Sequence, residues 1–212
     1  MVFLSFLCYD TECRKMKSVS SKSKKKGRAF MSLENKKVYS IEEYHNLPND
    51  IRTELIDGQI YYMEPPSRSH QKILEPLFKE IERYLKNKHK NYNVFKSPFS
   101  VQLKENENTV VEPDISMICE PEKQINFSYL GAPDWIIEII SSNHASHDYI
   151  RKLAHYCDAK VKEYWIVDPD KQSVLVYCFH KEEMDWNAYT FDDVIPVRSV
   201  PNFKIDFKKF KR

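Results

Sequence analysis

The chain has 212 residues and a formal net charge of +2, and its apolar and charged fractions are typical of a globular protein. No apolar stretch is long enough to span a membrane, and the short apolar start lacks the basic region of a signal peptide. The three glycines are scattered, which excludes a Walker loop and a GxGxxG turn. The five cysteines include no CxxC pair and argue against a zinc-thiolate site or a disulfide framework. The cysteine pattern therefore indicates a reducing compartment, the cytoplasm.

The excess positive charge is concentrated in the first 31 residues, so the remainder is slightly acidic. Ser/Lys repetition cannot bury apolar surface, so we expect residues 1–37 to be a disordered basic tail, with Met31 as an alternative natural start. Non-specific binding of nucleic acid is the functional alternative for this tail. We expect one folded domain over residues 38–207 and a short basic tail over residues 208–212.

Residue patterns in the first half predict a short capped helix, a hairpin and a long helix. Ser40 and Glu43 have the spacing of a capping box. Alternating residues on both sides of Asp57-Gly58 predict a hairpin over residues 54–63. Apolar residues at helical spacing predict an amphipathic helix over residues 69–88. Strands are predicted at 92–95, 100–103 and 109–119, before an irregular loop at 120–131.

The second half alternates between strand and helix patterns. Strands are predicted at 134–140, 162–167, 173–179 and 188–191, with a helix over 146–159 between the first two and a polar tail after the last. The order of these predicted helices and strands indicates an α/β fold, in which a mixed β-sheet is flanked by helices. The second half of the chain contains a strand–helix–strand unit.

Two carboxylates lie where the strand patterns are otherwise apolar. They are Asp114, within the predicted strand 109–119, and Glu138, within the predicted strand 134–140. A buried carboxylate without a partner costs several kcal/mol, so a cation, a metal or a strong set of hydrogen bonds must compensate it. Two on neighbouring strands suggest a shared divalent metal and hydrolytic chemistry. The alternative is a pair of structural carboxylates that accept hydrogen bonds from the backbone.

A magnesium shell could be completed by groups close to these carboxylates. The backbone carbonyl of Ile139 and several water molecules would add the remaining oxygen ligands, and Mn²⁺ would be an equivalent ion. Lys152 follows on the next predicted helix and shares a face with Asp148 and Tyr156, so its ammonium can reach back over the carboxylates. The alternative is a lysine that faces solvent and pairs with Asp148.

Several motifs together resemble the Uma-two family of predicted endonucleases. They are Glu112-Pro113-Asp114, the run from Ala132 to Ser141, the trio Asp148, Lys152 and Tyr156, and the run from Val161 to Pro169, with the hairpin around Gly58 and His70 upstream. The family belongs to the PD-(D/E)XK nuclease superfamily. The resemblance covers roughly Val38 to Phe207 and implies a restriction-endonuclease-like fold.

The resemblance implies a magnesium-dependent enzyme that hydrolyses DNA. Asp114 matches the aspartate of the family's first motif and Glu138 the acidic residue of its second. The usual lysine position is occupied by Ile140, and the family is similar in moving this lysine to the following helix, where Lys152 matches. Glu54 could add a carboxylate to the metal shell, and His70 could contact phosphate at the start of its helix.

Two hypotheses of different classes follow. The first is a Mg²⁺-dependent (or Mn²⁺-dependent) endonuclease with DNA as its partner, no membrane contact, and a homodimer as one open arrangement. The second is a catalytically silent module on the same fold that binds nucleic acid or another partner. Retention of Asp114, Glu138 and Lys152 favours the enzyme, whereas the slightly acidic body argues against strong general affinity for DNA.

Overall fold

The computed structural model describes residues 37–48, 51–88, 91–105, 107–119, 124–125, 128–141, 146–179 and 184–211. Of the basic tail expected at residues 1–37, all but Lys37 lies outside these ranges, so its disorder stays a prediction. No helix in the described ranges is long and apolar enough to cross a membrane.

The helices and strands follow the predicted order. The helical elements are α2 (Ile41–His45), α3 (Arg68–Lys88), α4 (Ser146–Ala159) and the 3-10 helix η2 (Phe207–Phe210). The first strands are β1 (Thr53–Ile56), β2 (Gln59–Tyr62), β3 (Asn93–Lys96), β4 (Ser100–Gln102), β5 (Val110–Val111), β6 (Ile115–Ile118), β7 (Gln124–Ile125) and β8 (Ser128–Leu130). The others are β9 (Trp135–Ile139), β10 (Glu163–Asp168), β11 (Ser173–Phe179), β12 (Met184–Thr190), β13 (Val194–Pro196) and β14 (Lys204–Asp206).

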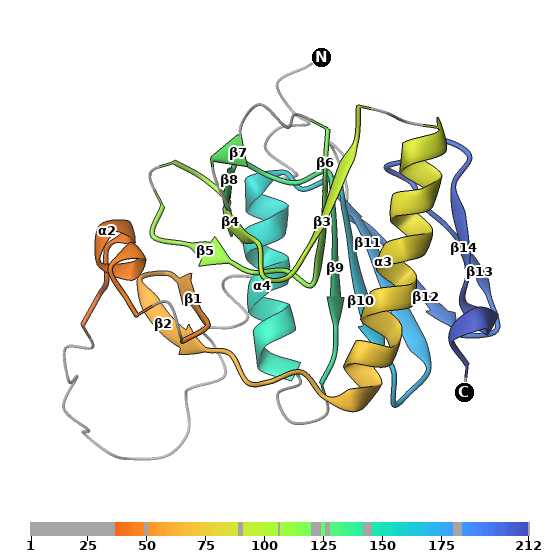
Figure 1. Ribbon diagram of the computed structural model, residues 1–212, viewed down its shortest axis with the longest axis horizontal. Coiled ribbons are helices and arrows are strands. Elements are labelled where there is room, and N and C mark those ends of the chain that lie inside the picture. Colours follow the sequence, from red (N-terminus) through yellow and green to blue (C-terminus); the bar gives the residue numbers. More distant parts are fainter. Residues whose placement is uncertain are drawn as a thin grey trace.

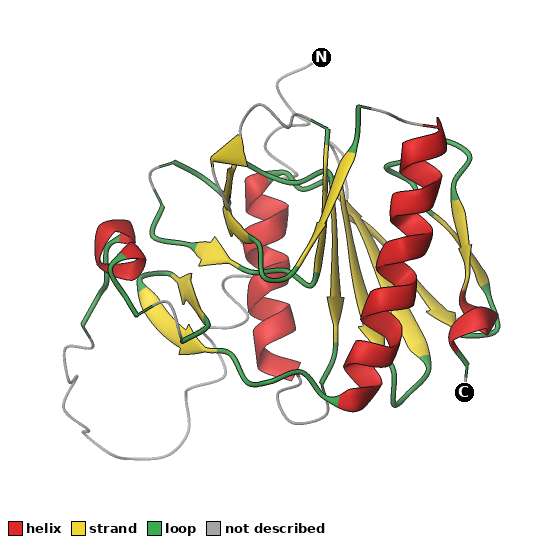
Figure 2. Ribbon diagram, in the orientation of Figure 1, coloured by secondary structure: helices red, strands yellow, loops and turns green. Residues whose placement is uncertain are grey.

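The strands form two six-stranded sheets and a small hairpin, arranged in layers. The main sheet has the order β12-β11-β10-β9-β6-β3, and the second sheet has the order β2-β1-β5-β4-β8-β7. Helix α3 and the β13–β14 hairpin pack on one face of the main sheet, and α4 packs between its other face and the second sheet. In Figure 1, α3 (yellow) and α4 (cyan) therefore lie on either side of β9, and Figure 2 shows the same layers by secondary structure.

Local sequence accounts for the helices. Ser40 and Glu43 form the predicted capping box, with each side chain bound to the other's backbone amide. In α3 the buried positions recur at intervals of three or four residues, through Ile73, Leu77 and Ile81, so the helix presents one apolar stripe to the main sheet. The burial of this stripe holds the start of α3 against the sheet.

The strand–helix–strand unit β9-α4-β10 positions the two predicted carboxylates. Strand β9 pairs parallel with β10 and antiparallel with β6, where Ile115 lies opposite Ile137. Extending that register by one residue places Asp114 opposite Glu138. Residues opposite each other in an antiparallel pair point to the same face of a sheet, so the register brings the two side chains together. Glu138 shares with Ile136 the face toward α4.

Two predictions about the middle of the chain are wrong. The strand predicted at 109–119 is divided into β5, which belongs to the second sheet, and β6, which belongs to the main sheet. The division falls at Glu112-Pro113-Asp114, where Pro113 has no N–H to continue a ladder of hydrogen bonds. The loop predicted at 120–131 contains β7 and β8, and β8 pairs in parallel with β4.

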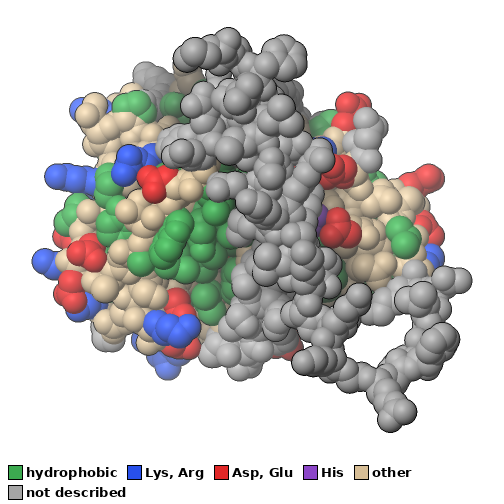
Figure 3. All heavy atoms as spheres, turned by 180° about the vertical axis from the view of Figure 1, so that it is seen from behind, with side chains coloured by type: hydrophobic (Ala, Val, Ile, Leu, Met, Phe, Trp, Pro, Cys, Tyr) green, Lys and Arg blue, Asp and Glu red, His purple; other side chains and the backbone are tan. Residues whose placement is uncertain are grey.

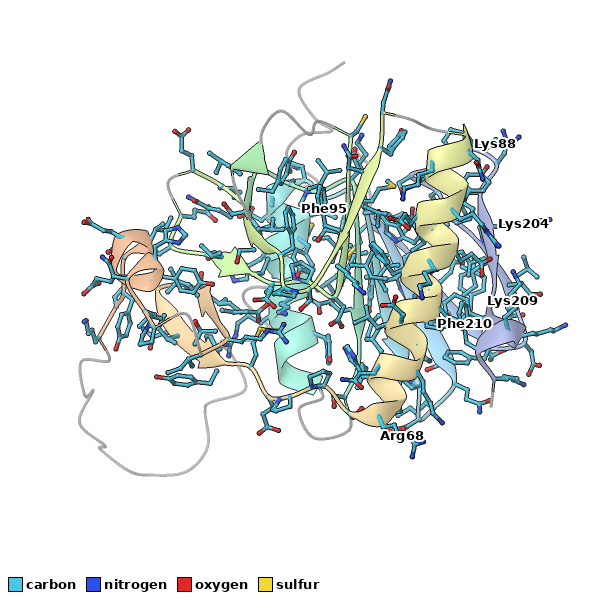
Figure 4. All side chains as sticks on the ribbon, viewed as in Figure 1. Arg68, Lys88, Phe95, Lys204, Lys209 and Phe210 are labelled. Carbon is cyan, nitrogen blue, oxygen red and sulfur yellow. The ribbon has the colours of Figure 1, made fainter. Side chains whose placement is uncertain are left out.

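The end of the chain is also more ordered than predicted. Strand β12 is longer than the strand predicted at 188–191, and β13, β14 and η2 follow where a polar tail was expected. The buried residues of β13, β14 and η2 are Ile195, Ile205 and Phe207, whose spacing within a charged segment gave no clear periodicity. Most of the predicted basic tail at 208–212 belongs to η2, and Figure 4 shows Lys209 and Phe210 beside α3, where Lys209 pairs with Glu80.

We predict that this C-terminal segment is part of the folded core. Phe207 is fully buried against Trp165 and Phe191, so Phe207→Ala should lower the free energy of unfolding by about 3–5 kcal/mol. The neighbouring Lys208 is exposed, so Lys208→Ala should change it by no more than about 0.5 kcal/mol. Urea denaturation measures both, and equal stability of the two variants would contradict the packing described here.

Candidate active site

One cavity of about 500 Å³ gathers the side chains that the sequence singled out. It lies where the carboxyl end of β9, the start of α3, the β1–β2 hairpin and α4 meet. Its lining includes all of the predicted catalytic, metal-binding and substrate-binding residues, namely Glu54, His70, Asp114, Glu138, Ile139 and Lys152. These residues come from five separate places in the sequence, so the tertiary structure assembles the site.

Lys152 is buried between two carboxylates. Its Nζ lies 2.8 Å from Oε1 of Glu54 and 3.0 Å from Oε1 of Glu138, and the residue is only 6% exposed. Helix α4 supplies the lysine, whereas β1 of the second sheet and β9 of the main sheet supply the carboxylates. The alternative of a lysine that faces solvent is therefore wrong.

Tyr156 completes the surroundings of Glu138. Its hydroxyl donates a hydrogen bond of 2.9 Å to Oε1 of Glu138, the same oxygen that Lys152 contacts. Oε2 of Glu138 accepts no hydrogen bond from the residues that the structure describes, and Glu138 lines the cavity. The sequence indicated only that Tyr156 and Lys152 share a helix face. Their spacing of four residues was the signal that could have identified this second donor.

Asp114 is also held through a single oxygen. Its Oδ2 accepts the amide of Ile139 at 2.7 Å and lies 2.9 Å from Nε2 of His70. In a hydrogen bond to a carboxylate oxygen, the ring nitrogen Nε2 of His70 is the donor. The backbone donor fits the structural alternative for Asp114, but Oδ1 accepts no hydrogen bond within the described part of the chain, and Asp114 lines the same cavity as Glu138.

Glu54 links the lysine to residues that the sequence analysis did not assign. Its Oε1 accepts the amide of Glu112 at 2.8 Å in addition to the ammonium of Lys152. The side chain of Glu112 in turn binds Arg52 and Ser97. Glu112 was quoted within a motif but given no role, and Arg52 was missed. The signal was the presence of a second carboxylate two residues before Asp114.

The pKa values of Glu138 and Lys152 are both raised in the folded protein. Burial raises the pKa of Glu138 to about 7, because desolvation and the nearby charges of Asp114 and Glu54 outweigh the attraction of Lys152. Burial alone would lower the pKa of Lys152, but the charges of Glu138 and Glu54 outweigh it and raise that pKa. The lysine therefore stays charged, whereas Glu138 titrates near neutral pH.

The donor set fits one hard divalent cation. Within the described ranges, no group of three or more His, Cys, Asp or Glu side chains is placed to hold a metal ion. Asp114 and Glu138 instead form a pair, each with one oxygen engaged by protein donors and one without a donor among the described residues. Mg²⁺ commonly takes only one or two carboxylates and fills its shell with water and substrate oxygens, so this pair suits it.

Three expectations about the site stay predictions. The carbonyl of Ile139 was expected to bind metal, but the described contact of this residue is its amide on Asp114. His70 was expected to contact phosphate, whereas the structure directs its Nε2 to Asp114. The side chain of Asp148, expected to accompany Lys152, lies outside the described residues.

Known proteins resemble this chain over most of its length. The family described as "Uma2: Putative restriction endonuclease" matches residues 41–208. An uncharacterised protein of Synechocystis sp., slr1290, is 25% identical over 158 residues, which cover 72% of this chain and 80% of that protein. The crystal structure of a putative nuclease of Anabaena variabilis, assigned to DUF820, matches with a TM-score of 0.69 at 22% identity, over 81% of this chain and 96% of that one.

The structural match concerns the fold. The mixed sheets and flanking helices of this chain share their arrangement with the Anabaena protein, so the α/β, restriction-endonuclease-like fold expected from the sequence is confirmed. The family match likewise confirms the resemblance that the motifs indicated.

We predict a pH-dependent contribution of Glu138 to stability. The pKa of Glu138 rises from its ordinary value of 4.5 to about 7 on folding. A raised pKa contributes stability that is complete below the unfolded value and is lost as pH rises through the folded one. The free energy of unfolding of the wild type should therefore fall relative to that of Glu138→Gln between about pH 4.5 and pH 8.

Urea denaturation across this range measures the difference. Glu43→Gln is a matched control, because Glu43 is exposed and its pKa is lowered by the amide of Ser40 and by Lys37. Its contribution has the opposite sign and changes only below about pH 4.5. A constant difference between the wild type and Glu138→Gln over the whole range would contradict the raised pKa.

Proposed function

This chain belongs to the Uma2 family, and we propose that it is a metal-dependent endonuclease that hydrolyses phosphodiester bonds of DNA. The observation that carries the proposal is the buried lysine in an open acidic cavity: Lys152 is held between Glu54 and Glu138, and Asp114 directly precedes the neighbouring strand β6. Combinations of carboxylates and a lysine serve phosphoryl chemistry, because the reaction requires charge neutralisation and a positioned water.

Asp114 and Glu138 are the residues that would hold Mg²⁺ or Mn²⁺. When bound there, such an ion supplies a Lewis acid that lowers the pKa of water and offsets the charge of the phosphate. The protein holds each of the two carboxylates through one oxygen. His70 and the amide of Ile139 fix one oxygen of Asp114, and Lys152 and Tyr156 fix one oxygen of Glu138. The other oxygens are available to the cation.

Lys152 would supply positive charge at the reacting phosphate. Its ammonium stays protonated between the two carboxylates and lines the cavity, so it can donate to a phosphate oxygen or hold the attacking water. Glu54 keeps the ammonium in place through one oxygen and is a positioning residue in this scheme. Its second carboxylate oxygen is the atom that could bind the metal, as the sequence analysis expected of Glu54.

The cost of the arrangement supports the enzyme over a silent module. Burying Lys152 with Glu54 and Glu138 requires desolvation of three charges, and apolar replacements of similar volume are often as stable or more so. A module that only binds a partner does not need these charges beside a cavity for chemistry. Retention is expected where the charges act on a substrate.

We predict that cleavage depends on Asp114 and Lys152. The wild type should nick supercoiled plasmid with Mg²⁺ or Mn²⁺ and not with EDTA. Asp114→Asn should lower the rate by about 10²-fold or more, because one preorganised electrostatic group is lost. Lys152→Gln should do the same and is preferable to an apolar replacement, since glutamine can still donate to the buried carboxylates. Lys152→Arg should restore little, because its planar fork differs from an ammonium.

Thermal melts must show that each variant is folded before rates are compared. Lys160→Gln is a suitable control, because Lys160 follows the same helix but does not line the cavity. A folded wild type that leaves plasmid intact with either metal would sink the endonuclease proposal and favour the silent module.

We further predict that Mg²⁺ binds through Glu138. Calorimetric titration should show binding by the wild type at about pH 8 and at least about tenfold weaker binding by Glu138→Gln, because the neutral amide removes a charged ligand. The oxygen-only donor pair should favour Mg²⁺ and Mn²⁺ over Zn²⁺. Equal Mg²⁺ affinity of both proteins would remove Glu138 from the metal site.

A further inference from the structure

Arg52 is an arginine on the wall of the catalytic cavity that the scheme above does not use. It precedes β1 by one residue and lies two residues before Glu54, so both side chains point to the same side of this extended segment. The side chain of Arg52 is 38% exposed, whereas that of its partner Glu112 is 8% exposed. The arginine therefore has one protected side and one side open to the cavity.

Contacts hold one edge of the guanidinium. Nε of Arg52 donates to Oε1 of Glu112 at 2.9 Å, and Nη2 contacts Glu112 and the hydroxyl of Ser97. The Ser97 hydroxyl also donates to Oε1 of Glu112 at 2.9 Å, so the three groups form a closed network. Nη1 has no hydrogen-bond acceptor among the described residues. Its two N–H groups are therefore unused donors on a side chain whose position is fixed.

The cavity needs such a donor because its charge is mostly negative. The basic residues that line it, among those described, are Arg52, His70 and Lys152. Lys152 is engaged by Glu54 and Glu138, and His70 is buried against Asp114. On the described surface visible in Figure 3, the view from behind Figure 1, Lys and Arg side chains are interspersed with Asp and Glu. Arg52 is thus the exposed cation at the site.

We propose that Nη1 of Arg52 binds a non-bridging oxygen of the DNA phosphate that enters this cavity. The proposal rests on the proposed function and assigns the group that recognises its substrate. An arginine held by a carboxylate on one edge can present its other edge to a phosphate, and charge-assisted hydrogen bonds of this kind are short and strong. Glu112 is the positioning residue, because its contacts set the orientation of the guanidinium.

The same network connects substrate binding to the catalytic lysine. Glu112 holds Arg52 through its side chain and holds Glu54 through its backbone amide, and Glu54 in turn holds Lys152. A phosphate bound by Arg52 is thereby held at a fixed position relative to Lys152, because both side chains are connected to Glu112. Placement of reacting groups through fixed supports is a principal source of rate enhancement.

The test measures binding of a fluorescent DNA duplex in EDTA, so that no cleavage occurs, over a range of salt concentrations. Arg52→Gln should raise Kd by about tenfold and reduce the slope of log Kd against log salt by about one, because one phosphate contact is lost. Arg52→Lys should keep the slope, since the charge remains, but should lower kcat, since the fork is lost. A structural role alone would leave the salt slope unchanged.

A double variant separates binding from folding. Arg52→Gln leaves the buried Glu112 without its cation, which destabilises the fold, whereas Arg52→Gln with Glu112→Gln replaces the ion pair by two amides. The double variant should recover the melting temperature but not the affinity or the salt slope. Arg83→Gln, an exposed arginine of α3 away from the cavity, should match the wild type in both measurements.

The outcomes separate this proposal from the proposed function. If the wild type cuts plasmid and the double variant binds duplex with the wild-type affinity and salt slope, the role of Arg52 is refuted while the endonuclease stands. If binding depends on Arg52 but the folded wild type cuts no DNA with Mg²⁺ or Mn²⁺, the endonuclease is refuted while the phosphate contact stands. A wild type that does not bind the duplex at all would overturn the role of Arg52.

Discussion

The site depends on one buried cation that joins three parts of the fold. Lys152 of α4 contacts Glu54 from the second sheet and Glu138 from the main sheet, and it is almost entirely removed from solvent. A buried ammonium cannot be left without compensation, so the two sheets and the helix must be placed together for the protein to be stable. The interaction that positions Lys152 in the cavity is thus also a constraint on how the layers pack.

The carboxylates around this lysine are each engaged on one side. Asp114, Glu138 and Glu54 all accept protein hydrogen bonds through a single oxygen, and all three line the same cavity. Such an arrangement fixes the direction of each carboxylate while leaving lone pairs for a cation, water or substrate. Burial, together with the nearby charges of Asp114 and Glu54, raises the pKa of Glu138, because Lys152 offsets its charge only in part.

Local patterns predicted the elements that carry the site but not all of their connections. The capping box at Ser40, the hairpin at Gly58, the apolar stripe of α3 and the β9-α4-β10 unit are each encoded in continuous segments of the sequence. The division of the strand at Pro113 and the ordered C-terminal segment were missed. The structure of the C-terminal segment depends on partners distant in the sequence, such as Trp165 for Phe207, and not on local periodicity.

The sequence by itself determined that Asp114 and Glu138 would be buried carboxylates and that Lys152 could reach them, because strand and helix periods set which residues share a face. Only the tertiary structure decided that Glu54 joins the lysine, that His70 turns to Asp114, and that Arg52 stands fixed at the cavity. The physical reason is that these contacts join residues 44 to 98 positions apart. Sheet pairing and packing of layers bring such residues together, and no short-range pattern records them.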